Sequence, residues 1–263
     1  MTDRSPLIQM TGTSKNFGRV QALTDVDLEL YDDEILATVG DNGAGKSTLI
    51  KILVGVLEPT EGTITIDGEP ANITNPTDAR AHGIGIVYQD LALVDSMTVA
   101  SNVFLGQEPT KRIGPLSIVD WETMNERARA IIKKNLNLDI DPTARVEFLS
   151  GGERQAVAIS RALVHEPDVI VLDEPTAALS EEVAQRVNDL IRSLRDRGHS
   201  VIVIDHDIDR VLDVADRVLV LHQGRRVAAV ETTGVTRDEI IHMMITGDTS
   251  GEVGDTAEEL AVD

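Results

Sequence analysis

The chain has 263 residues, of which 41% are hydrophobic, and this predicts one large folded domain or two small ones. Aromatic residues make up only 2%, so a base-stacking RNA module or an aromatic sugar-binding platform is not expected. Acidic residues outnumber basic ones by 45 to 24, and the formal net charge of −21 disfavours a nucleic acid partner, because it repels phosphate backbones.

The acidic excess consists of 26 Asp and 19 Glu, against 6 Lys and 18 Arg. Such a charge destabilises the compact state unless salt screens it, so we hypothesise a salt-rich cytosol, with an ordinary acidic bacterial protein as the alternative. The absence of cysteine excludes disulfides and thiolate metal sites. Residues 1–6 are polar and no apolar run approaches a membrane span. We therefore expect a soluble cytoplasmic chain, which another subunit must hold if it works at a membrane.

The chain carries two kinds of strand pattern. Val26, Leu28 and Leu30 alternate with acidic residues, and residues 63–67 alternate between Gly62 and Gly68, which predicts a small antiparallel sheet. Short apolar runs of the kind found in buried parallel strands form a second set, at residues 35–39, 169–172, 201–204 and 218–221. Each of the first three leads into a glycine or an acidic residue, where doubly wound folds place ligands.

Helical patterns lie between these runs. Residues 183–194 carry one apolar stripe, which predicts a helix, and Gly198 is placed to cap its C-terminus. A second helix is expected over residues 126–136. From residue 91 to residue 148 the strand signals fade, which we interpret as a helical insertion of about residues 91–160. The main domain is expected over residues 1–245, and an acidic, disordered tail over residues 246–263. No internal repeat is visible, so two fused copies of one domain are excluded.

The first chemical motif follows the run at residues 35–39. Residues 40–47 fit the phosphate-loop pattern G-x-x-x-x-G-K-S between a predicted strand and a predicted helix. Glycines let the backbone N–H groups surround an anion, and the helix adds the positive end of its dipole. Lys46 is expected to reach the β- and γ-phosphates, and Ser47 to bind Mg²⁺ through its hydroxyl.

The second motif ends the run at residues 169–172. Asp173 at this strand end is placed to hold Mg²⁺, directly or through water. Glu174 is placed to orient or deprotonate an attacking water. A pair that only caps a helix before Pro175 is the alternative interpretation, and the phosphate loop makes it much weaker.

The third motif, Leu-Ser-Gly-Gly-Glu-Arg-Gln at residues 149–155, resembles the signature of ABC-type ATPases. The order phosphate loop, signature and Asp-Glu strand end is typical of that family, and the resemblance covers residues 7 to about 230. It implies an α/β P-loop NTPase fold of the ABC ATPase type, with a mostly parallel core sheet, a flanking antiparallel β subdomain and a helical insertion. A P-loop kinase or GTPase does not explain residues 149–155.

The resemblance assigns roles to positions that match. Phe17 resembles the aromatic residue that stacks on adenine, Gln89 the residue that contacts Mg²⁺ and the attacking water, and His206 the one that contacts the γ-phosphate. The implied catalytic residues are Glu174, His206, Lys46 and Gln89, and the implied Mg²⁺ ligands are Ser47, Gln89 and Asp173. The implied ATP-binding residues are Phe17, Gly40, Asn42, Gly43, Ala44, Gly45, Lys46, Ser47, Thr48, Ser150, Gly151, Gly152 and Glu153.

The signature also implies a dimer. Ser150, Gly151 and Gly152 precede a helical run expected over residues 154–164, and in the family this surface binds ATP held by the phosphate loop of a second copy. Two chains, head to tail, would thus enclose two ATP molecules. Three positions depart from the family pattern: Glu153 replaces a usual Gln, Ser180 a frequent Asp, and Asp205 a frequent Ser or Thr.

The transported load is indicated by resemblance alone. Residues 83–106 and 174–180 resemble ATPase subunits of ribose-, fructose- and xylose-type importers, most of which fuse two ATPase domains. This implies integral membrane permease subunits, indirectly an extracellular substrate-binding protein, and a place at the cytoplasmic face of the membrane. The alternatives are a nucleoside importer, or a soluble ABC ATPase such as a cofactor-assembly subunit or a regulator of the cell envelope. Translation and repair types lack support, since no second domain, long coiled coil or cysteine is present.

Overall fold

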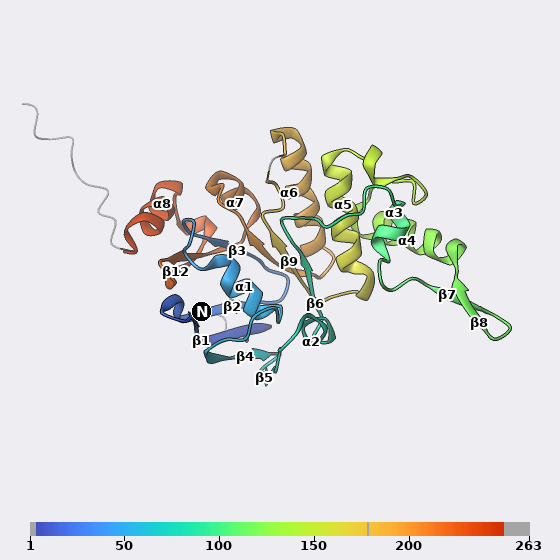
Figure 1. Ribbon diagram of the computed structural model, residues 1–263. Coiled ribbons are helices and arrows are strands. Elements are labelled where there is room, and N and C mark those ends of the chain that lie inside the picture. Colours follow the sequence, from blue (N-terminus) through green and yellow to red (C-terminus); the bar gives the residue numbers. More distant parts are fainter. Residues whose placement is uncertain (1–3, 178, 250–263) are drawn as a thin grey trace, which may run out of the picture.

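The computed structural model describes residues 4–177 and 179–249, in which helices cover a six-stranded sheet and a smaller antiparallel sheet (Figure 1). The expected fold class is confirmed. The part of the predicted tail at residues 250–263 lies outside the described residues.

The central sheet has the strand order β12-β11-β3-β10-β9-β6. All neighbours run parallel except β11 and β12, which form an antiparallel edge hairpin. The four strands expected from apolar runs are all present in it. Its strands are β3 (Ile35–Val39), β6 (Ile84–Val87), β9 (Val169–Asp173), β10 (Ser200–Ile204), β11 (Arg217–His222) and β12 (Arg225–Glu231).

Alternate residues of each central strand enter separate hydrophobic cores. In β10, Val201 and Val203 belong to a core built with α4, α5 and α6, whereas Ile202 and Ile204 belong to a core shared with α1 and the antiparallel sheet. Because successive side chains of a strand point to opposite faces, α1 and α5 cover opposite faces of the central sheet. The sheet therefore separates the residues packed on one face from those packed on the other.

The antiparallel sheet has the order β2-β1-β4-β5, as the alternating patterns predicted. Its strands are β1 (Ile8–Phe17), β2 (Val20–Leu30), β4 (Glu61–Ile66) and β5 (Glu69–Pro70). Gly62 lies inside β4 with a φ of +106°, where a Cβ would come within 2.7 Å of the backbone of Thr13. This glycine therefore allows close approach of β1 and β4, and does not form a turn as expected.

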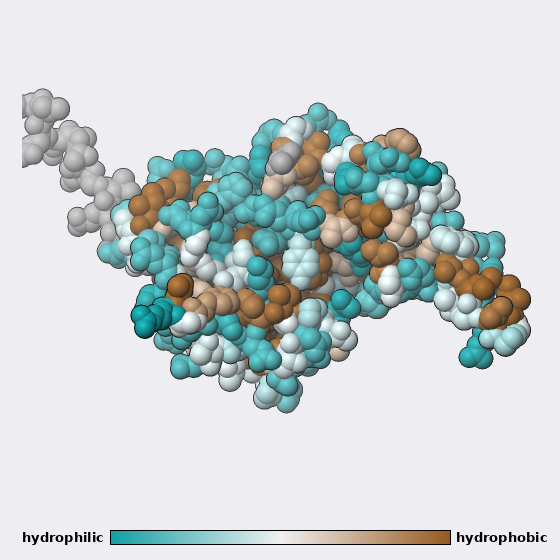
Figure 2. All heavy atoms as spheres, viewed as in Figure 1, coloured by the Kyte–Doolittle hydropathy of each residue, from teal (hydrophilic) through white to brown (hydrophobic). Residues whose placement is uncertain are grey.

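The helical insertion contains a hairpin that the sequence interpretation missed. Strands β7 (Thr110–Ile113) and β8 (Leu116–Val119) pair antiparallel, so the expectation of helices and loops throughout residues 91–148 was wrong. Each strand has only four residues, too few for clear alternation. The hairpin projects from the body and exposes apolar side chains, with Leu116 66% and Ile113 58% accessible (Figure 2).

The helices complete the layers. They are α1 (Lys46–Leu53), α2 (Pro76–Ala81), α3 (Val99–Val103), α4 (Trp121–Leu136), α5 (Gly151–Ala162), α6 (Glu181–Arg195), α7 (Ile208–Val214) and α8 (Arg237–Thr246), with short 3₁₀ turns η1 (Val146–Phe148), η2 (Leu163–His165) and η3 (Thr232–Gly234). Gly198 follows α6 with a positive φ of 89° and donates its N–H to the carbonyl of Arg195, as a helix-ending glycine does. Helix α8 continues through Thr246, past the expected domain end at residue 245. Within the described ranges, no helix combines the length and apolar character needed to cross a bilayer.

Candidate functional site

The phosphate loop joins β3 to α1 at the carboxyl edge of the central sheet. Gly40, Gly43 and Gly45 have positive φ angles of 154°, 86° and 102°. A Cβ at Gly40 would lie 2.4 Å from the carbonyl oxygen of Leu221, and one at Gly45 would lie 2.9 Å from that of Ala22. The loop thus needs glycine both for its backbone conformation and for its close packing against β2 and β11.

Lys46 begins α1 and is buried, at 8% exposed. Its ammonium donates hydrogen bonds to the carbonyl oxygens of Gly40, at 2.5 Å, and Asp41, at 3.1 Å. Burial lowers the pKa of Lys46, against the opposing effect of Glu174, Asp41 and Asp173. The cation is therefore held inside the loop by backbone dipoles and nearby carboxylates. Ser47 is exposed and Thr48 partly so, at the mouth of the loop.

Two carboxylates follow at the end of β9. Burial raises the pKa of Asp173, and the adjacent Glu174 raises it further. Glu174 adopts a left-handed φ of 48° and donates its N–H to the carbonyl of Ile204 at 2.8 Å. A non-glycine residue in this region carries backbone strain of about 1 kcal/mol or more, which the neighbouring strand must hold in place.

Two side chains from separate segments converge on the carboxylate of Glu174. The amide of Gln89, after β6, donates to one carboxylate oxygen at 2.7 Å, and Nδ1 of His206, after β10, lies 3.6 Å from the other. Glu174 is 23% exposed and His206 63% exposed, so the cluster faces solvent at the strand ends. Gln89, Glu174, His206 and Lys46 are thus brought together, because β6, β9, β10 and β3 all end at this edge.

Asp205 connects this cluster to the loop after Glu174. Its buried carboxylate accepts hydrogen bonds from the hydroxyl of Thr176 at 2.8 Å and from the N–H groups of His206, at 2.7 Å, and Asp207, at 3.0 Å. The sequence interpretation named Asp205 only as a departure and missed Thr176. The acidic residue at a strand end was the available signal, but its partner depends on β9 and β10 being neighbours. Ser180 is the N-cap residue of α6 and makes no side-chain cap hydrogen bond.

The signature segment has a different environment. Helix α5 begins at Gly151, so Gly151 and Gly152 lie in its first turn, which corrects the expected start at residue 154. Ser150 is the N-cap: its hydroxyl accepts from the N–H of Glu153, and the carboxylate of Glu153 accepts from the N–H and hydroxyl of Ser150 at 2.8 and 2.7 Å. The spacing S-x-x-E is the sequence signal for this capping box.

The structure does not bring the signature segment to the phosphate loop of its own chain. Helix α5 packs on the face of the central sheet opposite to α1, with Val157 and Ile159 in one core and Leu49 and Ile50 in the other. Their separation is visible in Figure 1. The predicted site is therefore divided between two surfaces of the chain.

Phe17 lies at the tip of the β1–β2 hairpin, 47% exposed, with the Lys15 ammonium 5.4 Å from its ring centroid. Its strand partner Val20 is two residues from Ala22, which packs against Gly45 of the phosphate loop. An accessible ring beside the loop is suited to stacking on a flat heterocycle.

The residues present fit a nucleotide phosphate with Mg²⁺. No side chain caps α1, whose N-cap is Gly45, so its first N–H groups are open to an anion. Among the described residues no group of three or more acidic or His side chains could hold a metal ion alone. Mg²⁺ bound with phosphates needs only one or two protein ligands, and Ser47 and Asp173 meet that need.

Comparison with known proteins agrees with this geometry. A family described as ABC transporter matches residues 23–177. The chain is 41% identical over 240 residues to the ribose import ATP-binding protein RbsA of Caldanaerobacter subterraneus subsp. tengcongensis, covering 91% of this chain and 48% of that protein. It is 42% identical to a putative ribose/galactose/methyl galactoside import ATP-binding protein of Burkholderia cenocepacia, covering 91% and 46%. The chain spans about half the length of these curated relatives.

Solved structures give the same result. The ADP conformation of the ATP-binding cassette MJ1267 matches with a TM-score of 0.77 and 26% identity, covering 91% of this chain and 94% of that one. A dimeric post-hydrolysis structure of the cassette MJ0796, bound to ADP and Pi, matches with a TM-score of 0.69 and 27% identity, covering 86% and 98%.

Proposed function

The chain belongs to the ABC transporter family, and we propose that it binds and hydrolyses ATP to power the import of a monosaccharide. The observation that carries the ATPase part is the convergence of Gln89 and His206 on Glu174, next to the phosphate loop. The sugar is supported by the relatives, which are named for ribose or galactose import.

In this proposal the residues of the cluster have distinct tasks, and Gln89 has two. Lys46 and the open N–H groups of α1 bind the β- and γ-phosphates. Ser47, Asp173 and Gln89 would hold Mg²⁺, whose charge would stabilise the negative charge of the phosphates. Glu174 accepts a proton from the attacking water, Gln89 fixes the orientation of that carboxylate, and His206 donates to the γ-phosphate.

We infer that two copies are needed. Since α1 and α5 cover opposite faces of the sheet, Ser150 cannot reach the phosphate loop of its own chain without unfolding the core between them. A second copy, related by twofold symmetry, would place its signature segment over that loop and complete both sites. The dimeric cassette MJ0796 supports this arrangement.

A groove next to Gln89 is suited to a membrane permease. Its volume is about 540 Å³, and it runs between α2, β6 and the start of the helical insertion, with Tyr88, Leu105 and Arg161 in its wall. Tyr88 precedes Gln89, so a partner in this groove would contact the chain neighbour of the residue that is bonded to Glu174. We propose that the permease docks here and holds the chain at the cytoplasmic face, with an extracellular binding protein delivering the sugar.

The test of the ATPase assignment is Glu174→Gln, because an amide keeps the hydrogen-bonding shape but cannot take a proton. We expect phosphate release to fall by roughly 10²- to 10⁴-fold while ATP binding persists and dimer accumulates. Glu182→Gln, an exposed glutamate on α6, is the matched control. Wild-type turnover in Glu174→Gln would reject the assignment.

The test of the importer is affinity purification from detergent-solubilised native membranes in high salt, followed by mass spectrometry. Recovery of a polytopic permease supports import, and a binding protein encoded nearby can then be screened against pentoses, hexoses and nucleosides. Recovery of soluble partners alone would reject transport and leave the ATPase site intact.

We also propose that the protein is adapted to high salt, and its large acidic excess supports this proposal. At about 1 M salt the Debye length is roughly 3 Å, which screens the self-repulsion of 21 net charges. Circular dichroism over a salt series should show structure forming as salt rises. Full structure and activity in dilute buffer would contradict this proposal.

A further inference from the structure

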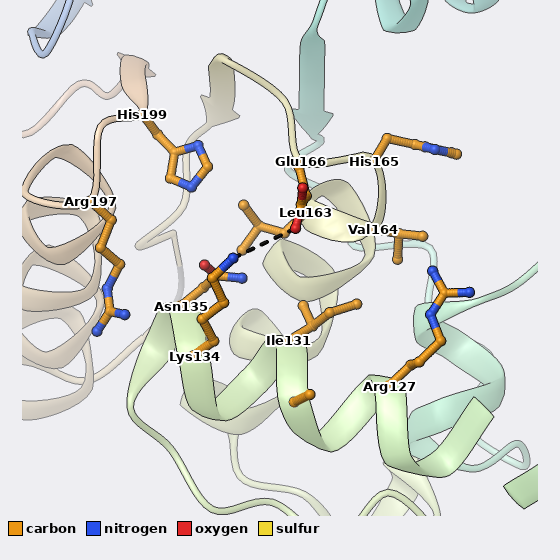
Figure 3. Close-up of a pocket in the computed structure, with 11 residues that line it drawn as sticks. Arg127, Ile131, Lys134, Asn135, Leu163, Val164, His165, Glu166, Arg197 and His199 are labelled. Atoms are coloured by element: carbon orange, nitrogen blue, oxygen red, sulfur yellow. Dashed lines mark ion pairs between the residues drawn. The ribbon is translucent and has the colours of Figure 1, made fainter. Parts of the chain in front are cut away.

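A second pocket lies at the opposite edge of the central sheet from the phosphate loop. It has a volume of about 720 Å³ and is formed by α4, by η2 with the following residue, and by the turn before β10 (Figure 3). Since η2 precedes β9 and the turn precedes β10, the pocket faces the amino ends of these strands. None of the residues assigned to ATP lines it.

Three of the side chains that line the pocket are cationic, those of Arg127, Lys134 and Arg197, and Glu166 is the single carboxylate in the lining. The imidazoles of His165 and His199 also line it. In a chain whose net charge is −21, the lining of this pocket has more cationic than anionic side chains, and this favours an anionic ligand.

The single acid of the pocket does little to neutralise it. Lys134 lies 3.6 Å from Glu166, and their side chains are 72% and 84% exposed, so this pair is weak and easily exchanged for another anion. Within the described part of the chain, Arg127 and Arg197 form no ion pair with a carboxylate, so neither has an anionic partner to lose when a ligand binds.

Two polar side chains of the lining, those of Arg127 and His199, are held in place. The guanidinium of Arg127 lies 5.0 Å from the ring centroid of Phe104, which is fully buried. Nδ1 of His199 is 2.7 Å from the carbonyl oxygen of Pro167, an acceptor only, so Nδ1 carries the hydrogen and Nε2 is left to accept one from a ligand hydroxyl. The sticks in Figure 3 show Arg127 and His165 toward one end of the pocket, and Arg197 and His199 toward the other.

The floor between these groups is apolar. Ile131, Val164 and the buried Leu163 form it, and the amide-bearing Asn135 lies beside them. A ligand that fits has a compact body between two anionic ends, with hydroxyl groups for an imidazole and an amide. The volume matches the range of pockets that bind small molecules, about 300–1,000 Å³.

We propose that this pocket binds a small organic phosphate carrying hydroxyl groups, of the size of a sugar bisphosphate. Arginine binds phosphate through paired N–H groups, and arginines at both ends favour two phosphates over one. The pocket differs from the phosphate loop as an ATP site, because its lining contains no glycine and no Phe, Tyr or Trp ring.

The position of the pocket also indicates a regulatory role. His165 lines both this pocket and the groove proposed for the permease, so an occupant contacts a wall of that groove. This step rests on the proposed function of the groove, whereas ligand binding itself does not.

The experiment is titration calorimetry of the full chain with fructose 1,6-bisphosphate as the probe, in saturating Mg-ADP to block the phosphate loop. We expect binding in moderate salt that weakens as salt rises, and a Kd at least tenfold higher in Arg127→Ala/Arg197→Ala. The matched control is Arg186→Ala/Arg225→Ala, which removes two exposed arginines outside the pocket and should leave the Kd unchanged. Arg197→Glu is a second variant, chosen because Arg197 is exposed.

Several outcomes would overturn the proposal. These are no binding of the bisphosphate, an unchanged Kd in both pocket variants, equal binding of unphosphorylated fructose, or equal binding of inorganic phosphate. If the importer proposal fails, the permease is not recovered but the bisphosphate still binds. If the pocket proposal fails, the bisphosphate does not bind while Glu174→Gln still abolishes hydrolysis.

Discussion

The N-termini of α1 and α5 offer the same chemistry to a phosphate, but the chain treats them differently. Helix α1 starts after Gly45 with no side-chain cap, whereas α5 starts after Ser150, whose hydroxyl and N–H are both bonded to Glu153. The open end can bind an anion as it stands. The closed end presents a carboxylate to an incoming phosphate, so binding there must displace or outweigh Glu153.

The two ends also cover opposite faces of the sheet, so they cannot act on one phosphate within a chain. In the proposed dimer, the α1 end would hold nucleotide by itself, and the α5 end would act only when a second copy brings a phosphate to it. The comparison therefore predicts that changes at the α1 end alter ATP affinity and that changes at the α5 end alter dimerisation.

The largest expected effect comes from inactivating the α1 end in one variant and the α5 end in another. Lys46→Ala disables the phosphate loop, and Ser150→Asp places a negative charge at the α5 end while keeping a good N-cap residue. We expect each variant alone to lose hydrolysis by more than about 100-fold. Mixed and re-equilibrated, they should recover about a quarter of wild-type activity, because half of the dimers contain one intact site out of two.

The control for this mixture is each variant mixed with itself, which should stay inactive. If the mixture does not recover hydrolysis although both variants are folded by circular dichroism and form dimers, the two helix ends do not form one site. Full activity of Ser150→Asp alone would show that the α5 end is not used.

The α1 end could be predicted from the sequence because its parts are adjacent in the chain. Gly40, Gly45, Lys46 and Ser47 lie within eight residues, and the strand before them is fixed by its apolar run. The convergence on Glu174 was predictable only through the resemblance, since Gln89 is 85 residues away and nothing local in the chain links the two.

Other parts could not be predicted because they depend on tertiary neighbours. The bond from Thr176 to Asp205 spans 29 residues and exists because β9 and β10 are adjacent. The β7–β8 hairpin has strands too short to show a period, although Gly114 and Pro115 between them are a turn signal. The sequence interpretation treated Glu153 as a departure from a usual Gln and as an implied ATP-binding residue, whereas its spacing from Ser150 already indicated a capping box.

The next largest effect is expected at Asp205, which connects the loop after β9 to the loop after β10. Asp205→Ala removes an acceptor used by Thr176, His206 and Asp207, and leaves buried donors unpaired. We expect kcat to fall roughly tenfold, equivalent to about 1.4 kcal/mol, with little change in KM for ATP. Asp205→Asn keeps an oxygen acceptor and is the matched control; an equal loss in both variants would show that charge, not loop position, matters.

A smaller effect is expected when the negative charge at the N-terminus of α5 is removed. Glu153→Gln keeps the capping geometry of α5 and removes its negative charge, so ATP-dependent dimerisation should strengthen by about two- to fivefold, equivalent to roughly 0.3–1 kcal/mol. Helix α8 supplies the control, because Thr236 and Glu239 form the same capping box there. Glu239→Gln should leave dimerisation unchanged, as measured by ATP-dependent light scattering. Equal effects of the two changes would mean that Glu153 acts only through its cap.

The smallest expected effect tests whether the stability that a capping box contributes depends on the charge of its glutamate. Hydrogen bonds from the N–H and hydroxyl of Thr236 lower the pKa of Glu239 below its ordinary 4.5. The ionised form is thus favoured by folding, so the stability from this cap is present above pH 4.5 and is lost as pH falls through the lower folded pKa. The melting temperature of wild type should exceed that of Glu239→Gln at pH 6, and the difference should shrink toward pH 3. A difference that stays constant over this range would mean that the cap acts by shape alone, and Glu153→Gln could then no longer separate charge from capping at α5.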